Sequence, residues 1–247
     1  MIGKEIHKFA SELWPLNRSL TGEGVRETLD KILKHIPNLV VKSVPSQTQV
    51  FDWTVPQEWA VREAYIITPS GKKICDFSEN NLHLLGYSIP FSGELTLGEL
   101  KKHLYTLPDQ PDAIPYITSY YKKRWGFSLS QNQFNSLQDG KYKVFIDTKL
   151  FDGELNYAEL LIPGKSEKEI FLSTYICHPS MANNELSGPI VSMALINYFR
   201  KKKLDKTIRF IFIPETIGSI CFLKKNLKYL KQNVIGGYNL TCIGDER

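Results

Sequence analysis

The chain of 247 residues is 42% hydrophobic and 23% charged, which is enough to bury one large core or two smaller ones and excludes a disordered protein. Its net charge of +5 comes from 31 basic and 26 acidic residues, and the one dense basic run, Lys201 to Lys203, is typical of a solvated helix end rather than of a nucleic-acid site. The four cysteines have no paired spacing, and no segment reaches the roughly 18 apolar residues that span a bilayer, so we expect a cytoplasmic protein with reduced thiols and no membrane partner.

The first fifty residues predict two helices and a strand. Ile6, Phe9 and Leu13 share one helical face over residues 4–13, and Pro15 ends that helix. Apolar side chains recur at helical spacing over residues 25–36, and residues 38–46 then have the apolar composition of a strand.

Residues 50–155 have a different, β-rich composition, with short alternating runs and Pro or Gly at frequent intervals. One helix is expected to interrupt them after Thr96, because Thr96 and Glu99 have the spacing of a capping box. Asp139 and Gly140 predict the turn of a hairpin. We therefore expect residues 50–155 to form a separate β-rich domain that is inserted into another domain.

Strands and helices alternate in the last third of the chain. Strand-like apolar runs cover residues 158–164, 169–176, 207–214 and 234–244, and amphipathic helical patterns cover residues 188–203 and 218–232. This order predicts an α/β fold with a mostly parallel, doubly wound sheet, in which residues 1–49 and 156–247 form one discontinuous domain.

Two loops of this domain carry polar residues directly after a strand. The first is CHPSMANNELSG, with His178, Asn184 and Glu185, and the second is PETIGS, with Glu215. Because parallel strands bring such loops to the same edge of a sheet, we expect the four side chains to face one crevice. Imidazole and carboxylate groups in that position are suited to hold a zinc-like ion and to accept a proton from its water.

Each of these residues also has a plain structural interpretation. His178 alone is as well explained by a hydrogen-bonded structural histidine, and the asparagines by helix caps. Glu215 is harder to explain in that way, since the tip of a buried strand seldom holds a carboxylate without a partner.

The two loops together resemble those of a known family. CHPSMANNELSGP and PETIGSICFL, with NRSLTGEGVRETL and WTVPQEW nearer the N-terminus, are similar to the zinc aminopeptidase-like proteins related to the M28 peptidases. They resemble in particular the bacterial subgroup that has an inserted β domain and is often found among polysaccharide-biosynthesis genes. The members of that subgroup are longer, so the resemblance implies a fold that is incomplete at Arg247.

The resemblance also implies a role for each candidate residue. His178 matches the metal-binding histidine, Asn184 the metal-bridging aspartate, Glu185 the asparagine beside it, and Glu215 the general base. Asn184 is a weaker ligand than a carboxylate, although Glu185 could reach the ion instead. Two further ligand positions of the family hold Thr216 and Thr241, and its last ligand histidine would lie beyond Arg247, so we expect at most one zinc ion, on His178 with Glu185 or Asn184.

Two further groups are weaker candidates. Asp245 and Glu246 follow the last predicted strand and could add a carboxylate to the same edge, although a solvated tail explains them better. Arg124 and Trp125 could line a substrate cleft of the inserted domain, but a packed β-edge with its charges in water is the stronger interpretation.

Two functions remain in competition. The first is a metallopeptidase-like hydrolase that cleaves a peptide or amide bond, including an amide on a sugar, with Glu215 as general base. The second is a catalytically inactive aminopeptidase-like domain that binds a ligand or partner, which the residues Asn184, Thr216 and Thr241 favour. We expect no nucleic-acid partner, and an incomplete sheet would expose an edge that favours a homo-oligomer.

Overall fold

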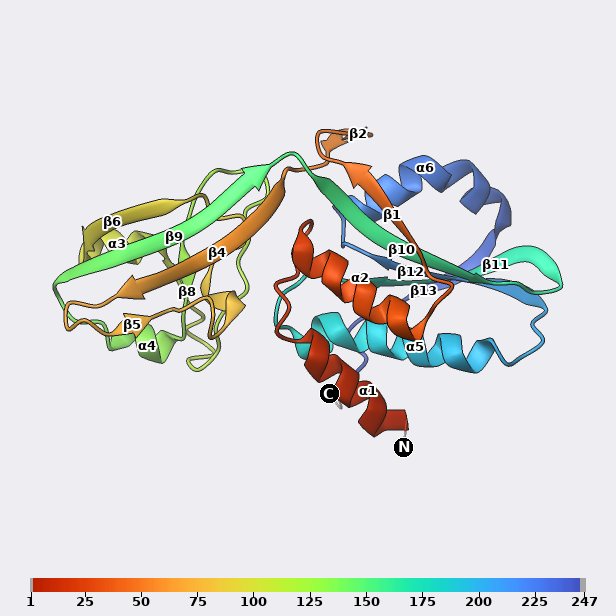
Figure 1. The fold of residues 1–247 in the computed structure, drawn as a ribbon, viewed down its shortest axis with the longest axis horizontal. Helices are drawn as coiled ribbons and strands as arrows, with labels where there is room; N and C mark the ends of the chain where they lie inside the picture. The colour runs from red at the N-terminus through yellow and green to blue at the C-terminus, as the bar shows by residue number, and fades with distance from the viewer. Residues whose placement is uncertain (1, 245–247) are drawn as a thin grey trace. The chain divides into compact units, whose positions relative to one another are not determined.

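The computed structural model describes residues 2–244, which divide into two compact units (Figure 1). One unit holds the described residues up to Glu58 and those from Asp152 onwards, and the other is Trp59–Phe151. The expected domain limits were residues 50 and 155; that the second unit is an inserted functional domain stays a prediction. No helix among residues 2–244 combines the length and the apolar character needed to cross a bilayer.

A five-stranded sheet forms the centre of the first unit, in the order β1-β10-β12-β11-β13. Its strands are β1 (Val40–Pro45), β10 (Glu154–Ile162), β11 (Ser166–Tyr175), β12 (Lys206–Ile213) and β13 (Val234–Asn239). The strands β11, β12 and β13 are parallel to one another, whereas β10 is antiparallel to both β12 and β1. A short pair, β2 (Gln49–Val50) and β3 (Trp53–Thr54), lies outside this sheet.

The sheet is therefore mixed: β1, β12, β11 and β13 run in one direction, in line with the expected mostly parallel sheet, and β10 runs against them. The physical reason is the turn of residues 163–165 between β10 and β11, because parallel strands need a crossover of a dozen or more residues. β10 must run against β11, and β12 is inserted between them. The Lys165 N–H donates to the carbonyl of Leu204, which fastens this turn to the residues before β12.

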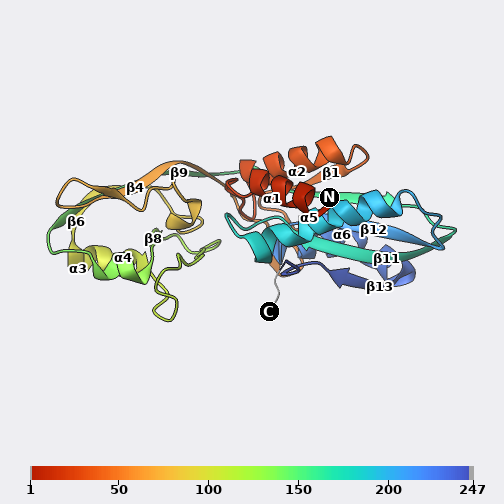
Figure 2. The same cartoon turned by 90° about the horizontal axis from the view of Figure 1, so that it is seen from below.

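Helices cover both faces of the sheet (Figures 1 and 2). The helices α2 (Glu23–His35) and α5 (Ser187–Phe199) pack on one face, and α1 (Ile2–Leu13) lies beside α5. The main core lies beneath them, and its members include Leu29, Ile32, Leu160, Leu172, Ile196 and Phe210. The helix α6 (Ile217–Asn233) covers the other face, where its Phe222 packs against Tyr157 and Phe171.

The second unit contains a four-stranded sheet in the order β5-β4-β9-β6. Its strands are β4 (Glu58–Ile67), β5 (Lys73–Ile74), β6 (Phe91–Thr96) and β9 (Lys141–Phe151), and β7 (Leu104–Tyr105) pairs with β8 (Phe127–Ser128). The short helices are α3 (Leu97–Leu100) and α4 (Gln131–Asn135), with 3₁₀ turns at Asn81–His83 and Lys101–His103. The expected capping box of Thr96 and Glu99 is present at the start of α3.

Two expectations for this unit are resolved by its packing. The Asp139–Gly140 turn does not close a hairpin, because the helix α4 precedes it and β9 pairs with β6 instead. Trp125 is buried and stacks on Phe91 and His103, so it belongs to the packing of the unit and not to a substrate cleft.

Candidate functional site

The loop after β11 contains a short π-helical segment, Ala182–Leu186, that leads directly into α5. A π-helix adds a residue to the turn and is found often at functional sites. The backbone at Gly188 lies close to β11 and to the segment after β13, and only glycine fits there. A Cβ at this position would lie 2.1 Å from both the Leu240 carbonyl oxygen and Thr174 Oγ1. The Ser-Gly-Pro sequence thus lets α5 start against β11 and the segment after β13.

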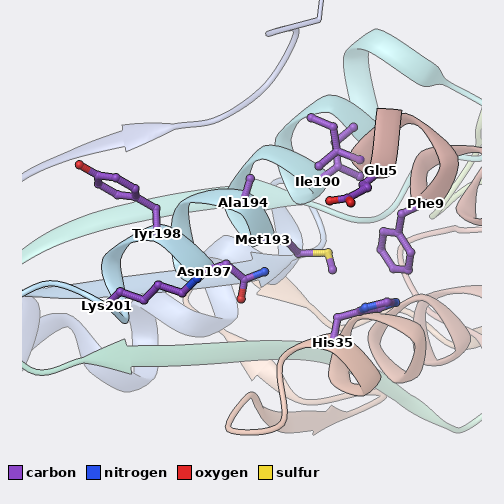
Figure 3. A pocket seen from close by; sticks show the side chains of 10 residues that line it. Glu5, Phe9, His35, Ile190, Met193, Ala194, Asn197, Tyr198 and Lys201 are labelled. Carbon is purple, nitrogen blue, oxygen red and sulfur yellow. The ribbon is translucent and has the colours of Figure 1, made fainter. Parts of the chain in front are cut away.

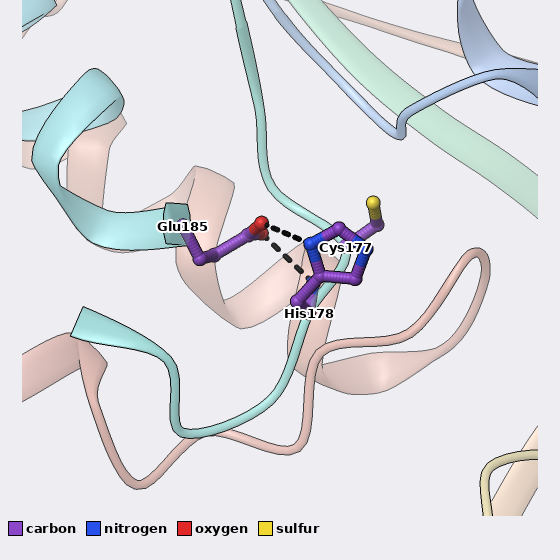
Figure 4. A group of neighbouring side chains, drawn as sticks. All are labelled: Cys177, His178 and Glu185. Carbon is purple, nitrogen blue, oxygen red and sulfur yellow. Dashed lines mark hydrogen bonds and ion pairs between the residues drawn. The ribbon is translucent and has the colours of Figure 1, made fainter. Parts of the chain in front are cut away.

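His178 is the centre of the candidate site, and two carboxylates face its ring. Nδ1 lies 2.9 Å from Glu185 Oε2, and Nε2 lies 3.3 Å from Glu215 Oε2 (Figure 4 shows the first of these pairs). The other oxygen of Glu185 accepts the backbone N–H of His178 at 2.9 Å. The structure therefore brings together His178, Glu185 and Glu215, which the sequence analysis expected at one edge.

Arg18 completes this group from the turn between α1 and α2, and the sequence analysis did not identify it. Its buried guanidinium donates from Nε to the His178 carbonyl at 3.1 Å and from Nη1 to the Leu13 carbonyl, and Nε lies 3.7 Å from Glu185 Oε1. The side chains of Arg18 and Glu185 are both fully buried. The signal available in the sequence was the NRSLTGEGVRETL segment, which was noted for its resemblance alone.

These contacts set the protonation of the ring. Burial on its own would lower the pKa of His178, but the hydrogen bond and the charge of Glu185, together with the charge of Glu215, raise that pKa above its ordinary value. A ring that faces a carboxylate at each nitrogen donates to both only as imidazolium. When His178 is protonated, its charge and that of Arg18 balance the charges of Glu185 and Glu215.

Glu215 lies between the end of β12 and the start of α6, and its side chain is about half exposed, at 47%. Its backbone N–H donates to Cys177 Sγ at 3.1 Å. The next residue, Thr216, has a φ of 58°, and Ser180 and Cys242 in the neighbouring loops have φ values of 44° and 52°. Such left-handed conformations cost on the order of 1–3 kcal/mol each and gather at functional sites.

The other expected site residues lie around this group in different ways. Asn184 stands in the π-helical segment, where its backbone carbonyl accepts from Thr241 Oγ1 at 3.0 Å and its amide is 3.7 Å from Cys242 Sγ. Thr241 therefore supports the loop rather than facing the His178 ring. Asp245 and Glu246 lie outside the described residues.

A metal ion would have to use the donors that these contacts leave open. Cys177 Sγ, a His178 ring nitrogen and a Glu185 oxygen lie within 4.8 Å of one another (Figure 4). Burial raises the pKa of the Cys177 thiol well above its ordinary value, however, and Glu185 already faces Arg18 and Nδ1 of His178. Nε2 of His178, which faces Glu215, and the amide of Asn184 remain, whereas catalytic zinc needs three protein ligands. The described residues do not by themselves fit a zinc site.

Two cavities of this unit bear on the site among residues 2–244. One, of about 380 Å³, is lined by Glu215 together with residues of β11, β13 and the first turn of α6. The larger one, of about 620 Å³, lies between α1, α2 and α5 and contains none of the expected site residues (Figure 3). Its floor is formed by apolar side chains such as Phe9, Ile190 and Met193. Glu215 therefore connects the candidate site with the smaller cavity.

Known proteins match almost the whole chain. A protein of Clostridium acetobutylicum, named for polysaccharide biosynthesis and for an aminopeptidase-like domain, is 51% identical over 243 residues, which are 98% of this chain and 56% of the relative. A crystal structure from Clostridium acetobutylicum, named as that of a peptidase, covers 99% of this chain and 57% of its own, with 50% identity and a TM-score of 0.94. The chain thus spans little more than half the length of these relatives.

More distant structures share the fold. A zinc aminopeptidase from Bacillus subtilis has a TM-score of 0.66 at 12% identity, covering 98% of this chain and 69% of its own. An M28 peptidase precursor from Shewanella amazonensis has a TM-score of 0.61 at 11% identity, covering 95% and 73%. The family described as a domain of unknown function, DUF4910, matches residues 7–247. The chain therefore belongs to the DUF4910 family, and it shares the fold of zinc aminopeptidases and of an M28 peptidase precursor, the group that its sequence motifs resemble.

Proposed function

We propose that this chain is a ligand-binding, aminopeptidase-like domain of a polysaccharide-biosynthesis protein, and that it works without a two-metal centre. One observation carries the proposal: the carboxylate of Glu185 is fully buried between Arg18 and His178. The Glu185 carboxylate is thus already paired with a guanidinium and an imidazole, whereas a metal-binding loop needs a carboxylate that is free to bind the ion. The ligand would bind at the carboxyl ends of β11 and β12, where Glu215 is accessible.

Charge balance supports this view. Bringing a divalent cation next to Arg18 and His178 would place three positive groups around Glu185 in a buried setting, where like charges repel strongly. Asn184 would contribute a neutral amide, which attracts such an ion less than a carboxylate does. Without a metal ion, the charges of Arg18 and of protonated His178 balance those of Glu185 and Glu215.

A second candidate function is a hydrolase that uses one zinc ion, and the 3.3 Å approach of His178 Nε2 to Glu215 favours it. In that case His178 with Asn184 or Glu185 would hold the ion, which would lower the pKa of a bound water, and Glu215 would accept the proton of that water. The target would be a peptide or amide bond, as in the zinc aminopeptidases that share the fold.

Metal content separates the two candidates. We expect the purified chain, loaded with zinc and then dialysed against a weak chelator, to retain far less than one zinc per chain by elemental analysis. The chain should also release no amine from leucine p-nitroanilide. The matched variants are His178→Ala and, as a control away from the site, His7→Ala at an exposed position of helix α1. About one zinc per chain that is lost in His178→Ala and kept in His7→Ala, with cleavage of the anilide, would instead establish the hydrolase.

A further inference from the structure

The cavity of about 380 Å³ beside Glu215 has a composition that points to its ligand. It lies between β11, β13 and the first turn of α6. Its lining consists of the aromatic residues Phe171, Tyr175 and Tyr238, the uncharged polar residues Ser173, Ser219 and Asn239, and Glu215 with Gly237. The volume is near the lower end for small-molecule sites, which suits a single ring rather than a polymer segment.

The polar side chains of this cavity are available to a ligand. The side chains of Ser173, Ser219 and Asn239 make no hydrogen bond to another residue within the described range 2–244. Two hydroxyls and an amide offer both donors and acceptors, as a ligand with several hydroxyl groups requires. A ligand that lacks hydroxyls would leave these groups to water and gain nothing from them.

Two of the aromatic rings are held in place by the surrounding structure. Phe171 packs against Phe222 of α6, with ring centroids 5.9 Å apart, and Tyr175 meets the ring of His178 edge to face at 5.8 Å. Tyr238 is largely exposed on β13 and forms the outer wall. Rings that are already fixed lose little freedom on binding, and their faces attract the positively polarised C–H groups and cations of a ligand.

The charge of the cavity limits the classes of ligand that it can bind. Among residues 2–244, its one charged lining residue is Glu215; Oε2 of this carboxylate faces Nε2 of His178 at 3.3 Å, behind the cavity wall, and no lysine, arginine or histidine belongs to the lining itself. A phosphate or a carboxylate on the ligand would be repelled by Glu215, because the one cationic group beside it, His178, already faces the carboxylates of Glu185 and Glu215. A primary ammonium group would instead form a charge-assisted hydrogen bond with Glu215.

We propose that this cavity binds an amino sugar with a free amine, its ammonium group on Glu215, its hydroxyls on Ser173, Ser219 and Asn239, and its apolar face against the aromatic rings. This inference deepens the proposed function, on which it rests, by naming the ligand class. Acetylation of the amine removes the charge that Glu215 recognises, so the acetylated sugar binds less well. A phosphorylated amino sugar is disfavoured for the reason given above.

Binding of small sugars to the unmodified chain tests the proposal. We expect D-glucosamine to give saturation-transfer NMR signals and a measurable Kd by calorimetry, with at least tenfold weaker binding of D-glucose, N-acetylglucosamine and glucosamine 6-phosphate. Leucinamide carries the same ammonium group without a sugar ring and should also bind at least tenfold more weakly. Equal binding of glucose and glucosamine, absence of any sugar binding, or a preference for leucinamide would each overturn the proposal.

Variants locate the binding. We expect Glu215→Gln to weaken glucosamine binding at least tenfold and to abolish the preference over glucose, and Asn239→Ala to weaken both sugars severalfold. Glu79→Gln, an exposed carboxylate in the other unit, should leave Kd unchanged. Unchanged binding in folded Glu215→Gln, checked by circular dichroism, would reject the site. Zinc retention is measured separately, so glucosamine binding can fail while the metal-free function stands, or the reverse.

Discussion

The guanidinium of Arg18 links the N-terminal turn to the loop that carries His178. It donates to the carbonyl of His178 and to that of Leu13, and it lies beside the carboxylate of Glu185. Glu185 in turn holds both the backbone and the ring of His178. Because each of these groups is buried, none of them can exchange its partner for water at low cost.

Replacing Arg18 by Gln should therefore destabilise the fold strongly. The change leaves the Glu185 carboxylate buried with a single charged neighbour, His178, and removing one partner of a buried pair costs about 3–5 kcal/mol. We expect a fall of that order in the free energy of unfolding, measured by urea denaturation. The double variant Arg18→Gln with Glu185→Gln should recover part of the loss, since it removes the unpaired charge.

The matched control is Lys165→Gln, which breaks the exposed ion pair with Asp205. Exposed pairs contribute little to stability, so this variant should unfold at the same urea concentration as the unmodified chain. An Arg18→Gln variant as stable as Lys165→Gln would contradict a structural role of the buried guanidinium.

The sequence predicted three of the four central residues and missed the fourth. His178, Glu185 and Glu215 follow strands whose ends meet at one sheet edge, so their proximity follows from topology. Arg18 contacts His178 across 160 residues of sequence, and its position in a polar turn suggests exposure. Its burial depends on tertiary packing, which no local pattern contains. The same packing places Glu185 between His178 and Arg18, and its expected role as a metal ligand stays a prediction.

Helices were more predictable than the direction of strands. The amphipathic spacing of α1, α2, α5 and α6 is a local property, and each was expected close to its observed bounds. Strand direction depends on connection length: the three-residue turn at Pro163–Gly164 forces β10 to run against β11. The hairpin expected at Asp139–Gly140 is absent for a similar reason, since β9 pairs with the distant strands β4 and β6.

The start of α5 depends on close backbone contact at Gly188, and a substitution there should be costly. In Gly188→Ala the new Cβ would lie 2.1 Å from the Leu240 carbonyl oxygen and from Thr174 Oγ1, so the helix or the segment after β13 must move. We expect a loss of about 1–3 kcal/mol in unfolding free energy, as for an overpacked core. The measurement is urea denaturation followed by circular dichroism.

Gly98→Ala in α3 is the matched control, because no atom lies within 4 Å of the position of its Cβ. Alanine is the better helix former, so this variant should be as stable as the unmodified chain or up to about 1 kcal/mol more stable. If both alanine variants behaved alike, the close approach at Gly188 would not be a determinant of stability.

The two edges of the large sheet differ in their protection against another chain. β1 carries Lys42 and Pro45, which discourage the addition of a strand. β13, with the sequence VIGGYN, has neither a charged residue nor a proline, and its Ile235 and Tyr238 are 57% and 69% exposed. Within residues 2–244, β13 pairs with β11 alone. Its outer backbone donors and acceptors are thus open to a partner.

We predict that a second copy of the chain adds to this edge, so that the chain forms a concentration-dependent dimer in sedimentation velocity experiments. Ile235→Lys should shift the equilibrium to monomer, because an edge lysine opposes strand addition. Ile235 does not line the cavity beside Glu215, so glucosamine binding should persist in this variant. Val41→Lys places the same charge on β1 and should leave the dimer intact. A monomer at every concentration would exclude association through β13, and an equal effect of both lysines would attribute it to general surface hydrophobicity instead.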